Sequence, residues 1–282
     1  MPFRANPWFS CNAAIAGIVM LAIVARPAHA QTFHAVTVEP FVIITDFPFP
    51  QAPQVRDHLV SLGERLHAEL GLKPVRETVK IYLLKSPERY QKLLLAVMPQ
   101  LQVGDTQRHG VFLRRRGEMP AMFVLWSDRV GTVLRHEFTH ATLSANVANP
   151  SIWLDEGIAS YYEAESLAAA NLYRETLEPR LAASSAWTPD LARLERLRQM
   201  PEMGPMEYAE SWSWIRFLLS GPPEVRDLLP KYLAQAASDN NPRPLSASLS
   251  RIYSSPATPL SDQWRHHFTA SSEPSKRSTN SK

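Results

Sequence analysis

Apolar residues form two kinds of pattern along the first part of the chain, short runs and a repeat at helical spacing. The unbroken run Phe41–Thr45 is typical of a buried strand. Leucines then recur at near-helical spacing over residues 59–70 and stop before Gly71, which indicates an amphipathic helix. Val79–Leu84 and Pro87–Val97 repeat this order as a second strand and a second helix. The chain is therefore expected to begin as strand, helix, strand, helix.

The remaining pattern completes the expected fold. A β-hairpin is predicted with arms at Gly110–Leu113 and Ala121–Trp126, joined by a turn that contains Arg114-Arg115-Arg116-Gly117. The chain beyond the hairpin is predicted to be almost wholly helical. These elements predict an α+β protein, with an N-terminal mixed sheet and helices over residues 31–127 and a mostly helical part over residues 128–269.

The first thirty residues are expected to be a secretory signal. Arg4 precedes the apolar run Ala13–Ala25, and the small-residue site Ala28-His29-Ala30 follows it. The run of 13 residues is shorter than the roughly 20 needed to span a bilayer, so cleavage before Gln31 is favoured over a membrane anchor. The mature protein is then exported, to the periplasm or out of the cell.

Composition narrows the possible chemistry. Cys11 is the only cysteine and would leave with the signal, which excludes disulfides and Cys-ligated metals in the mature chain. The formal charge of +3 falls to +1 without Arg4 and Arg26, so neither nucleic-acid binding nor stable membrane insertion is expected. The Ser- and Lys-rich tail over residues 270–282 is expected to be disordered.

His136-Glu137-Phe138-Thr139-His140 forms an H-E-x-x-H pattern in a segment expected to be helical. Four residues advance a helix by about 400°, so both imidazoles project from one face and can chelate one ion. Zinc suits this nitrogen pair, although manganese or cobalt could substitute. Glu137 lies about 100° around the helix, near the metal, where a general base could take a proton from a metal-bound water.

A third ligand is needed to separate this interpretation from a chance pattern. The motif occurs by chance in roughly one or two such chains per hundred, and Leu134 and Phe138 form an apolar stripe that could leave the histidines facing water. Glu156 lies sixteen residues beyond His140. Two helices joined around Asn149-Pro150 would return its carboxylate to the histidines, giving the ligand set of a catalytic zinc site with an open position.

The sequence H-E-F-T-H followed by W-L-D-E-G-I-A-S-Y resembles the gluzincin metallopeptidases of the peptidase MA clan. Its W-L-x-E-G element is similar to that of the aminopeptidase N family, and the overall layout is closest to small exported peptidase MA-like proteins of uncharacterised function. The resemblance implies one zinc ion per chain with His136, His140 and Glu156 as ligands and Glu137 as the base. It is specific over about residues 130–165.

The chain departs from the aminopeptidases in one element. It has no G-x-M-E-N sequence, which in that family binds the free N-terminus of a substrate, and Gly117-Glu118-Met119-Pro120 is not a match. Endopeptidase activity is therefore favoured over aminopeptidase activity. Ala121–Trp126 is the expected edge strand for pairing with an extended substrate.

Supporting roles are assigned to three further residues. Related enzymes often use a tyrosine from a later helix to stabilise the oxyanion, which favours Tyr208 over Tyr161, Tyr162 and Tyr173. Asp155 and Glu163 are candidates for carboxylates that orient a metal ligand, and either could equally be a surface charge.

The predicted function is that of an exported zinc metallopeptidase acting on peptide or protein substrates. One alternative is a gluzincin-shaped periplasmic binding or assembly protein that hydrolyses nothing. Another is a helical module in which the motif arose by chance. Substrate preference and oligomeric state stay open at this stage.

Overall fold

A computed structural model describes residues 33–99, 108–164, 167–184, 187–238, 242–255 and 259–270. The expected signal segment, and the expected tail beyond Ala270, lie outside these residues. The described chain divides into two compact units. The first takes the residues up to Glu64 together with Pro74–Ala145, and the second takes Arg65–Lys73 together with the residues from Asn146 onward.

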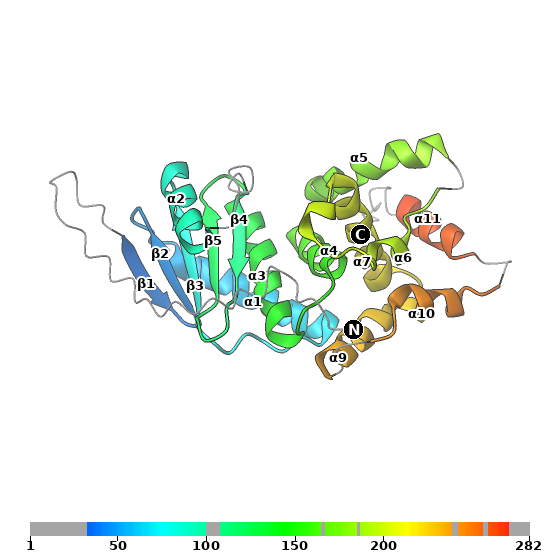
Figure 1. Cartoon of the computed structure of the whole chain (residues 1–282), viewed down its shortest axis with the longest axis horizontal. Helices are drawn as coiled ribbons and strands as arrows, with labels where there is room; N and C mark the ends of the chain where they lie inside the picture. Colours follow the sequence, from blue (N-terminus) through cyan, green and yellow to red (C-terminus); the bar gives the residue numbers. More distant parts are fainter. Residues whose placement is uncertain are drawn as a thin grey trace, which may run out of the picture. The chain divides into compact units, whose positions relative to one another are not determined.

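The first unit contains a mixed five-stranded sheet (Figure 1). Its strands are β1 (His34–Val38), β2 (Phe41–Thr45), β3 (Val79–Leu84), β4 (Gly110–Leu113) and β5 (Ala121–Leu125). The order across the sheet is β1-β2-β3-β5-β4, with β2, β3 and β5 parallel and the two outer strands antiparallel to their neighbours. The predicted mixed sheet is therefore confirmed.

Helices pack on both faces of this sheet. The helices concerned are α1 (Ala52–Leu70), α2 (Pro87–Val97) and α3 (Val130–Asn146). On one face Tyr82 stacks on Phe123 with ring centroids 4.9 Å apart, in an apolar cluster with Tyr90 of α2. On the other face Phe41 meets the ring of Phe138 of α3 edge-on at 5.6 Å. The contact between Phe41 and Phe138 helps to fix α3 against the sheet.

The hairpin is present, but the expected edge strand was wrong. β5 lies between β3 and β4, so Gly110–Leu113 forms the edge of the sheet. Four of the five residues of β5 are buried, as suits an interior strand, whereas every residue of β4 is only partly buried. An extended ligand could therefore pair with β4 and not with Ala121–Trp126.

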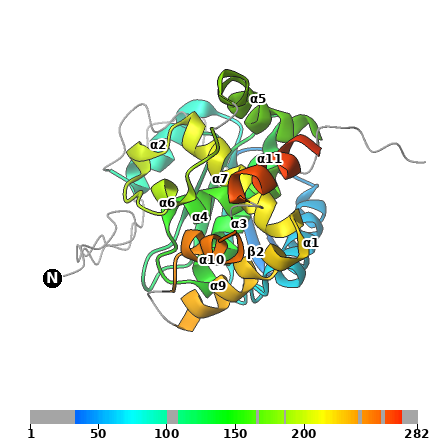
Figure 2. The ribbon, with the colours of Figure 1, turned by 90° about the vertical axis from the view of Figure 1, so that its right-hand side faces the viewer.

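The second unit is helical, apart from loops, in its described residues. Its helices after the end of α1 are α4 (Ile152–Glu163), α5 (Leu167–Ala183), α6 (Leu191–Leu194), α7 (Pro205–Ser220), α8 (Pro223–Arg226), α9 (Leu228–Ser238), α10 (Leu245–Ile252) and α11 (Leu260–Ala270), with a 3₁₀ turn at Met200–Glu202. Figure 2 shows α7 among its neighbours, and it contacts α4, α5, α6, α8, α9 and α11. The expected α+β class is confirmed.

The apolar side chains of α7 explain why this helix lies at the centre of the second unit. Trp212, Trp214 and Phe217 are each at most 2% exposed, so the helix is apolar on more than one side. Two ion pairs also hold the first two turns of α7, because Arg193 of α6 pairs with Glu207 at 2.8 Å and with Glu210 at 2.6 Å.

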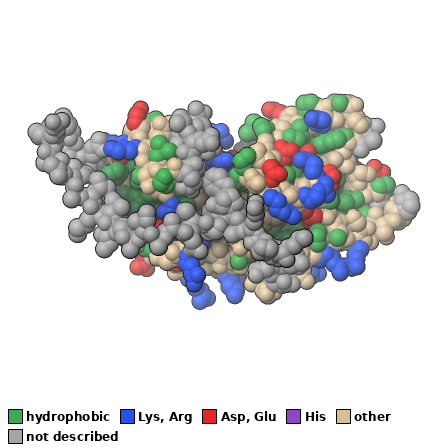
Figure 3. All heavy atoms as spheres, in the orientation of Figure 1, with side chains coloured by type: hydrophobic (Ala, Val, Ile, Leu, Met, Phe, Trp, Pro, Cys, Tyr) green, Lys and Arg blue, Asp and Glu red, His purple; other side chains and the backbone are tan. Residues whose placement is uncertain are grey.

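Surface charge in the described part is mixed in sign. Figure 3 shows acidic and basic side chains next to one another on the face in view. Among the described helices, none has the length and apolar character required to cross a bilayer.

Candidate metal centre

The motif residues lie in the middle of α3, where one stripe of the helix packs inward. Leu134, Phe138 and Ala141 are at most 4% exposed and attach the helix to the sheet. His136 and His140 lie on another face and are only partly buried. The predicted helix and its predicted apolar stripe are both present.

The two imidazoles converge at their Nε2 atoms. The distance between Nε2 of His136 and Nε2 of His140 is 3.0 Å, and the ring centroids are 4.7 Å apart. Two nitrogen ligands of one tetrahedral zinc, each at 2.0–2.1 Å, would lie about 3.3 Å apart. The pair therefore has a spacing close to that of two ligands of one ion.

Glu156 completes a group of three possible ligands. One ligand atom from each of His136, His140 and Glu156 lies within 4.8 Å of the others. Glu156 is 7% exposed, so its carboxylate belongs to the buried part of α4. Two imidazoles and a carboxylate form a donor set that suits zinc, so these residues fit the expected ion.

The loop between α3 and α4 has features that turn the chain sharply. Asn149 has a φ of 54°, a left-handed conformation that asparagine tolerates better than most residues. Pro150 follows it, and α4 begins at Ile152. At the end of α3, the Asn146 side chain accepts a hydrogen bond from Lys73 N–H at 2.7 Å and donates one to Lys73 O at 2.9 Å. The connection predicted around Asn149-Pro150 is thus present.

Glu137 points toward the edge strand of the sheet. Its side chain is 5% exposed and lies against the backbone of Gly110 in β4 and the side chain of Val133. The negative charge of the Glu137 carboxylate also acts on Tyr90 of α2. Burial raises the pKa of the Tyr90 phenol, and the Glu137 carboxylate raises it further. Nothing in the local sequence pattern pointed to Gly110 or Tyr90, because both approach Glu137 through the fold.

The three supporting candidates have defined positions, while their roles stay predictions. Asp155 and Glu163 are both partly exposed residues of α4 on either side of Glu156 in the sequence. Glu163 follows Glu156 by seven residues and so shares its helix face, whereas Asp155 is turned by about 100°. Tyr208 lies in the first turn of α7 and is partly buried.

The close contact of α4 with α7 is set by a glycine next to Glu156. A Cβ added to Gly157 would lie 3.0 Å from Ile215 Cγ1 and 3.1 Å from the backbone oxygen of Ser211. Tyr208 lies three residues before Ser211 and therefore on the same face of α7. The face of α7 that carries Tyr208 is thus the face that packs on α4.

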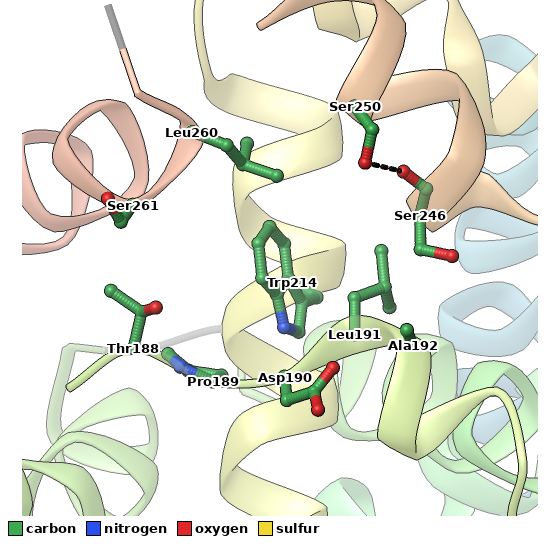
Figure 4. Close-up of a pocket in the computed structure, with 10 residues that line it drawn as sticks. All are labelled: Thr188, Pro189, Asp190, Leu191, Ala192, Trp214, Ser246, Ser250, Leu260 and Ser261. Carbon is green, nitrogen blue, oxygen red and sulfur yellow. Dashed lines mark hydrogen bonds between the residues drawn. The ribbon is translucent and has the colours of Figure 1, made fainter. Parts of the chain in front are cut away.

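A separate cavity of about 270 Å³ lies within the second unit, and none of the three possible ligands lines it (Figure 4). It is lined by Thr188, Pro189, Asp190, Leu191, Ala192, Trp214, Ser246, Ser250, Leu260 and Ser261. The hydroxyl of Ser250 is already used, since it donates to the backbone oxygen of Ser246 at 2.9 Å. Trp214 of α7 lines this cavity and is 2% exposed.

No known protein family matches this chain, and no curated protein matches it either. The geometry of the three side chains is therefore the evidence on which a function can be based.

Proposed function

We propose that this chain is a zinc-dependent metallopeptidase, a hydrolase of peptide bonds. The supporting observation is the approach of His136, His140 and Glu156 to within 4.8 Å of one another, beside a second buried carboxylate. In the proposal the three residues hold one zinc ion, which supplies Lewis acidity toward water and carbonyl oxygens. The resemblance to gluzincins seen in the sequence leads to the same assignment.

Glu137 is the proposed general base. A metal site that only stabilises a fold uses a closed set of ligands and has no need for an additional buried carboxylate next to it. Glu137 would take the proton of the attacking water and pass it to the leaving amine, a transfer that contributes about 10²–10⁴-fold to rate. Its burial at 5% exposure favours proton transfer to substrate over exchange with solvent.

The proposed substrate is an extended peptide segment within a protein or peptide, cleaved internally. β4 is the outer strand of the sheet in the described residues, and Glu137 lies against its first residue, Gly110. An extended chain that pairs with this edge would run past the base. Tyr208 is the proposed donor to the oxyanion, supported by its place on the α7 face that packs on α4 next to Glu156.

Export is part of the proposal and rests on the sequence of the first thirty residues. Intact mass of the protein recovered from periplasm or medium should match a chain that begins at Gln31. Recovery of the uncleaved chain from the cytoplasm alone would contradict export.

The decisive test compares three purified proteins for zinc content and for cleavage of a broad peptide library. Wild type should contain about one zinc per chain and cut internal bonds. Glu137→Gln should keep its zinc and lose about 10²–10⁴-fold in turnover, and Glu156→Ala should lose zinc. A zinc-loaded wild type that cuts nothing would instead favour a binding or assembly protein.

A further inference from the structure

We propose that Gly110 is a positioning residue for Glu137: by lacking a side chain at the edge strand, it provides the space that holds the carboxylate in place. The inference rests on the proposed function for the role of Glu137 as general base. The lack of space between Gly110 and Glu137 is given by the geometry alone. Neither the motif nor its resemblance to gluzincins points to residue 110.

The space is small and is bounded by Glu137 itself. A Cβ added to Gly110 would lie 2.5 Å from Oε1 of Glu137 and 2.9 Å from its Cγ. It would also lie 2.4 Å from Cγ1 of Val133, which is one helical turn before Glu137 on α3. Non-bonded carbon atoms attract one another at about 3.5–4.0 Å, so any larger residue at 110 would displace at least one of these groups.

Backbone conformation does not explain the glycine. In the described chain Gly71 and Gly117 have positive φ values of 72° and 81°, and a Cβ on either would meet no atom within 4 Å. Those two positions favour glycine for its conformational freedom. Gly110 lies in a strand without a positive φ, so its role is to leave room.

The strand cannot easily move away to make room for a side chain. Gly110 faces Val124 in the β4–β5 register, and Leu125 N–H donates to His109 O at 2.8 Å next to it. Displacing the start of β4 would break this ladder. A larger residue at position 110 would therefore displace the side chain of Val133 or that of Glu137. The Glu137 side chain is the longer and more flexible of these two, so it would move more easily.

A set of variants of the full-length protein tests the positioning role. All variants are made in a Val133→Ala background, which removes the Cγ1 methyl group that a Cβ at position 110 would overlap. In this background the new Cβ overlaps only with Glu137. In this background Gly110→Ala should lower kcat about 10²-fold, because displacement of a reacting group by about 1 Å can cost that much. KM and zinc content should be unchanged. Gly63→Ala is the matched control, since its Cβ would meet only Phe138 at 3.6 Å.

Rescue distinguishes positioning from a general structural defect. Glu137→Asp shortens the side chain by one methylene, so it should lower kcat in the Val133→Ala background but raise it about tenfold in the Gly110→Ala/Val133→Ala background. A Gly110→Ala/Val133→Ala protein with unchanged kcat, or one whose loss Glu137→Asp does not relieve, would overturn the positioning role.

A second measurement needs no turnover and so separates this inference from the proposed function. In the Val133→Ala background, Gly110→Ala should lower the urea midpoint of unfolding, and at least half of that loss should disappear when Glu137 is replaced by Ala. An equal loss with and without the Glu137 side chain would refute the shared space, whatever the enzyme does. If wild type cut no peptide while this coupling held, the proposed function would fail and the spatial inference would stand.

Discussion

At the scale of single residues, Tyr90 is a buried phenol without a hydrogen-bond partner among the described residues. It is 1% exposed, and its hydroxyl is enclosed next to the apolar cluster under α2. A buried polar group left unsatisfied costs about 1–3 kcal/mol. Tyr90→Phe keeps the ring and removes this cost, so the free energy of unfolding should rise by about 1 kcal/mol in urea titrations. A fall would indicate that the hydroxyl is bonded in the folded protein.

Tyr208 has a proposed role that depends on its hydroxyl group, as the donor of a hydrogen bond to the oxyanion. Loss of one oxyanion donor typically lowers kcat by about 10²–10³-fold. Tyr208→Phe should produce a loss of that order, with KM and zinc content nearly unchanged, in steady-state assays. Tyr173→Phe is the control because Tyr173 stacks on Trp212 at 5.5 Å and should lose little activity. Equal activity of the two variants would remove Tyr208 from the mechanism.

At the scale of elements, two helical glycines should respond in opposite ways to the same substitution. Gly63 in α1 has room for a Cβ, and Ala is favoured over Gly in a helix by about 1 kcal/mol. Gly157 in α4 has no such room, because α7 lies 3.0–3.1 Å from the added atom. Gly63→Ala should raise the urea midpoint, whereas Gly157→Ala should lower it by forcing α4 and α7 apart. Two changes of the same sign would contradict this account.

The elements that the sequence predicted are those with strong local signals. Phe41–Thr45, Val79–Leu84 and Pro87–Val97 have the expected bounds, the last with Pro87 in its first turn and Ser86 accepting from Arg89 N–H at 3.2 Å as its cap. β1 was not predicted. Its three central residues are exposed, so the strand depends on pairing with β2 rather than on an apolar pattern.

The same distinction applies to the candidate metal centre. The histidines follow from helical spacing, and Glu156 follows from a short connection between two helices. Gly110 could not be predicted, since its contact with Glu137 depends on β4 being the outer strand. Strand order is a non-local property, and the error over the edge strand has the same origin.

At the scale of the whole molecule, stability should depend on pH through His267. Burial lowers the pKa of this imidazole to about 4, and the charges of Arg216 on α7, of His266 and of Arg226 on α8 lower it further. The folded state thus disfavours the protonated ring, while the unfolded chain takes up a proton near pH 6.5. Stability from this group is complete above pH 6.5 and is lost as pH falls toward 4.

This loss can be measured against a variant. Allowing for solvent screening of a partly exposed ring, His267 should account for about 1–2 kcal/mol between pH 6.5 and 4. Glutamine does not titrate. Between pH 6.5 and 4 the free energy of unfolding of His267→Gln should therefore fall by about 1–2 kcal/mol less than that of wild type. His109→Gln, an exposed histidine that is not among the groups acting on His267, is the control. Parallel curves for wild type and His267→Gln would refute the assignment.

Zinc should also stabilise the whole molecule if the three ligands bind it as proposed. An ion that binds the folded chain alone raises the free energy of unfolding by RT ln(1 + [Zn]/Kd), which is about 2.7 kcal/mol at a hundredfold excess over Kd. The ligand atoms come within 4.8 Å only through the fold, because Glu156 is the twentieth residue after His136 in the chain. Melting temperature should therefore rise on adding zinc to chelator-treated protein, rise equally for Glu137→Gln, and change little for Glu156→Ala. A rise of the same size in Glu156→Ala would mean that the stabilising ion binds elsewhere.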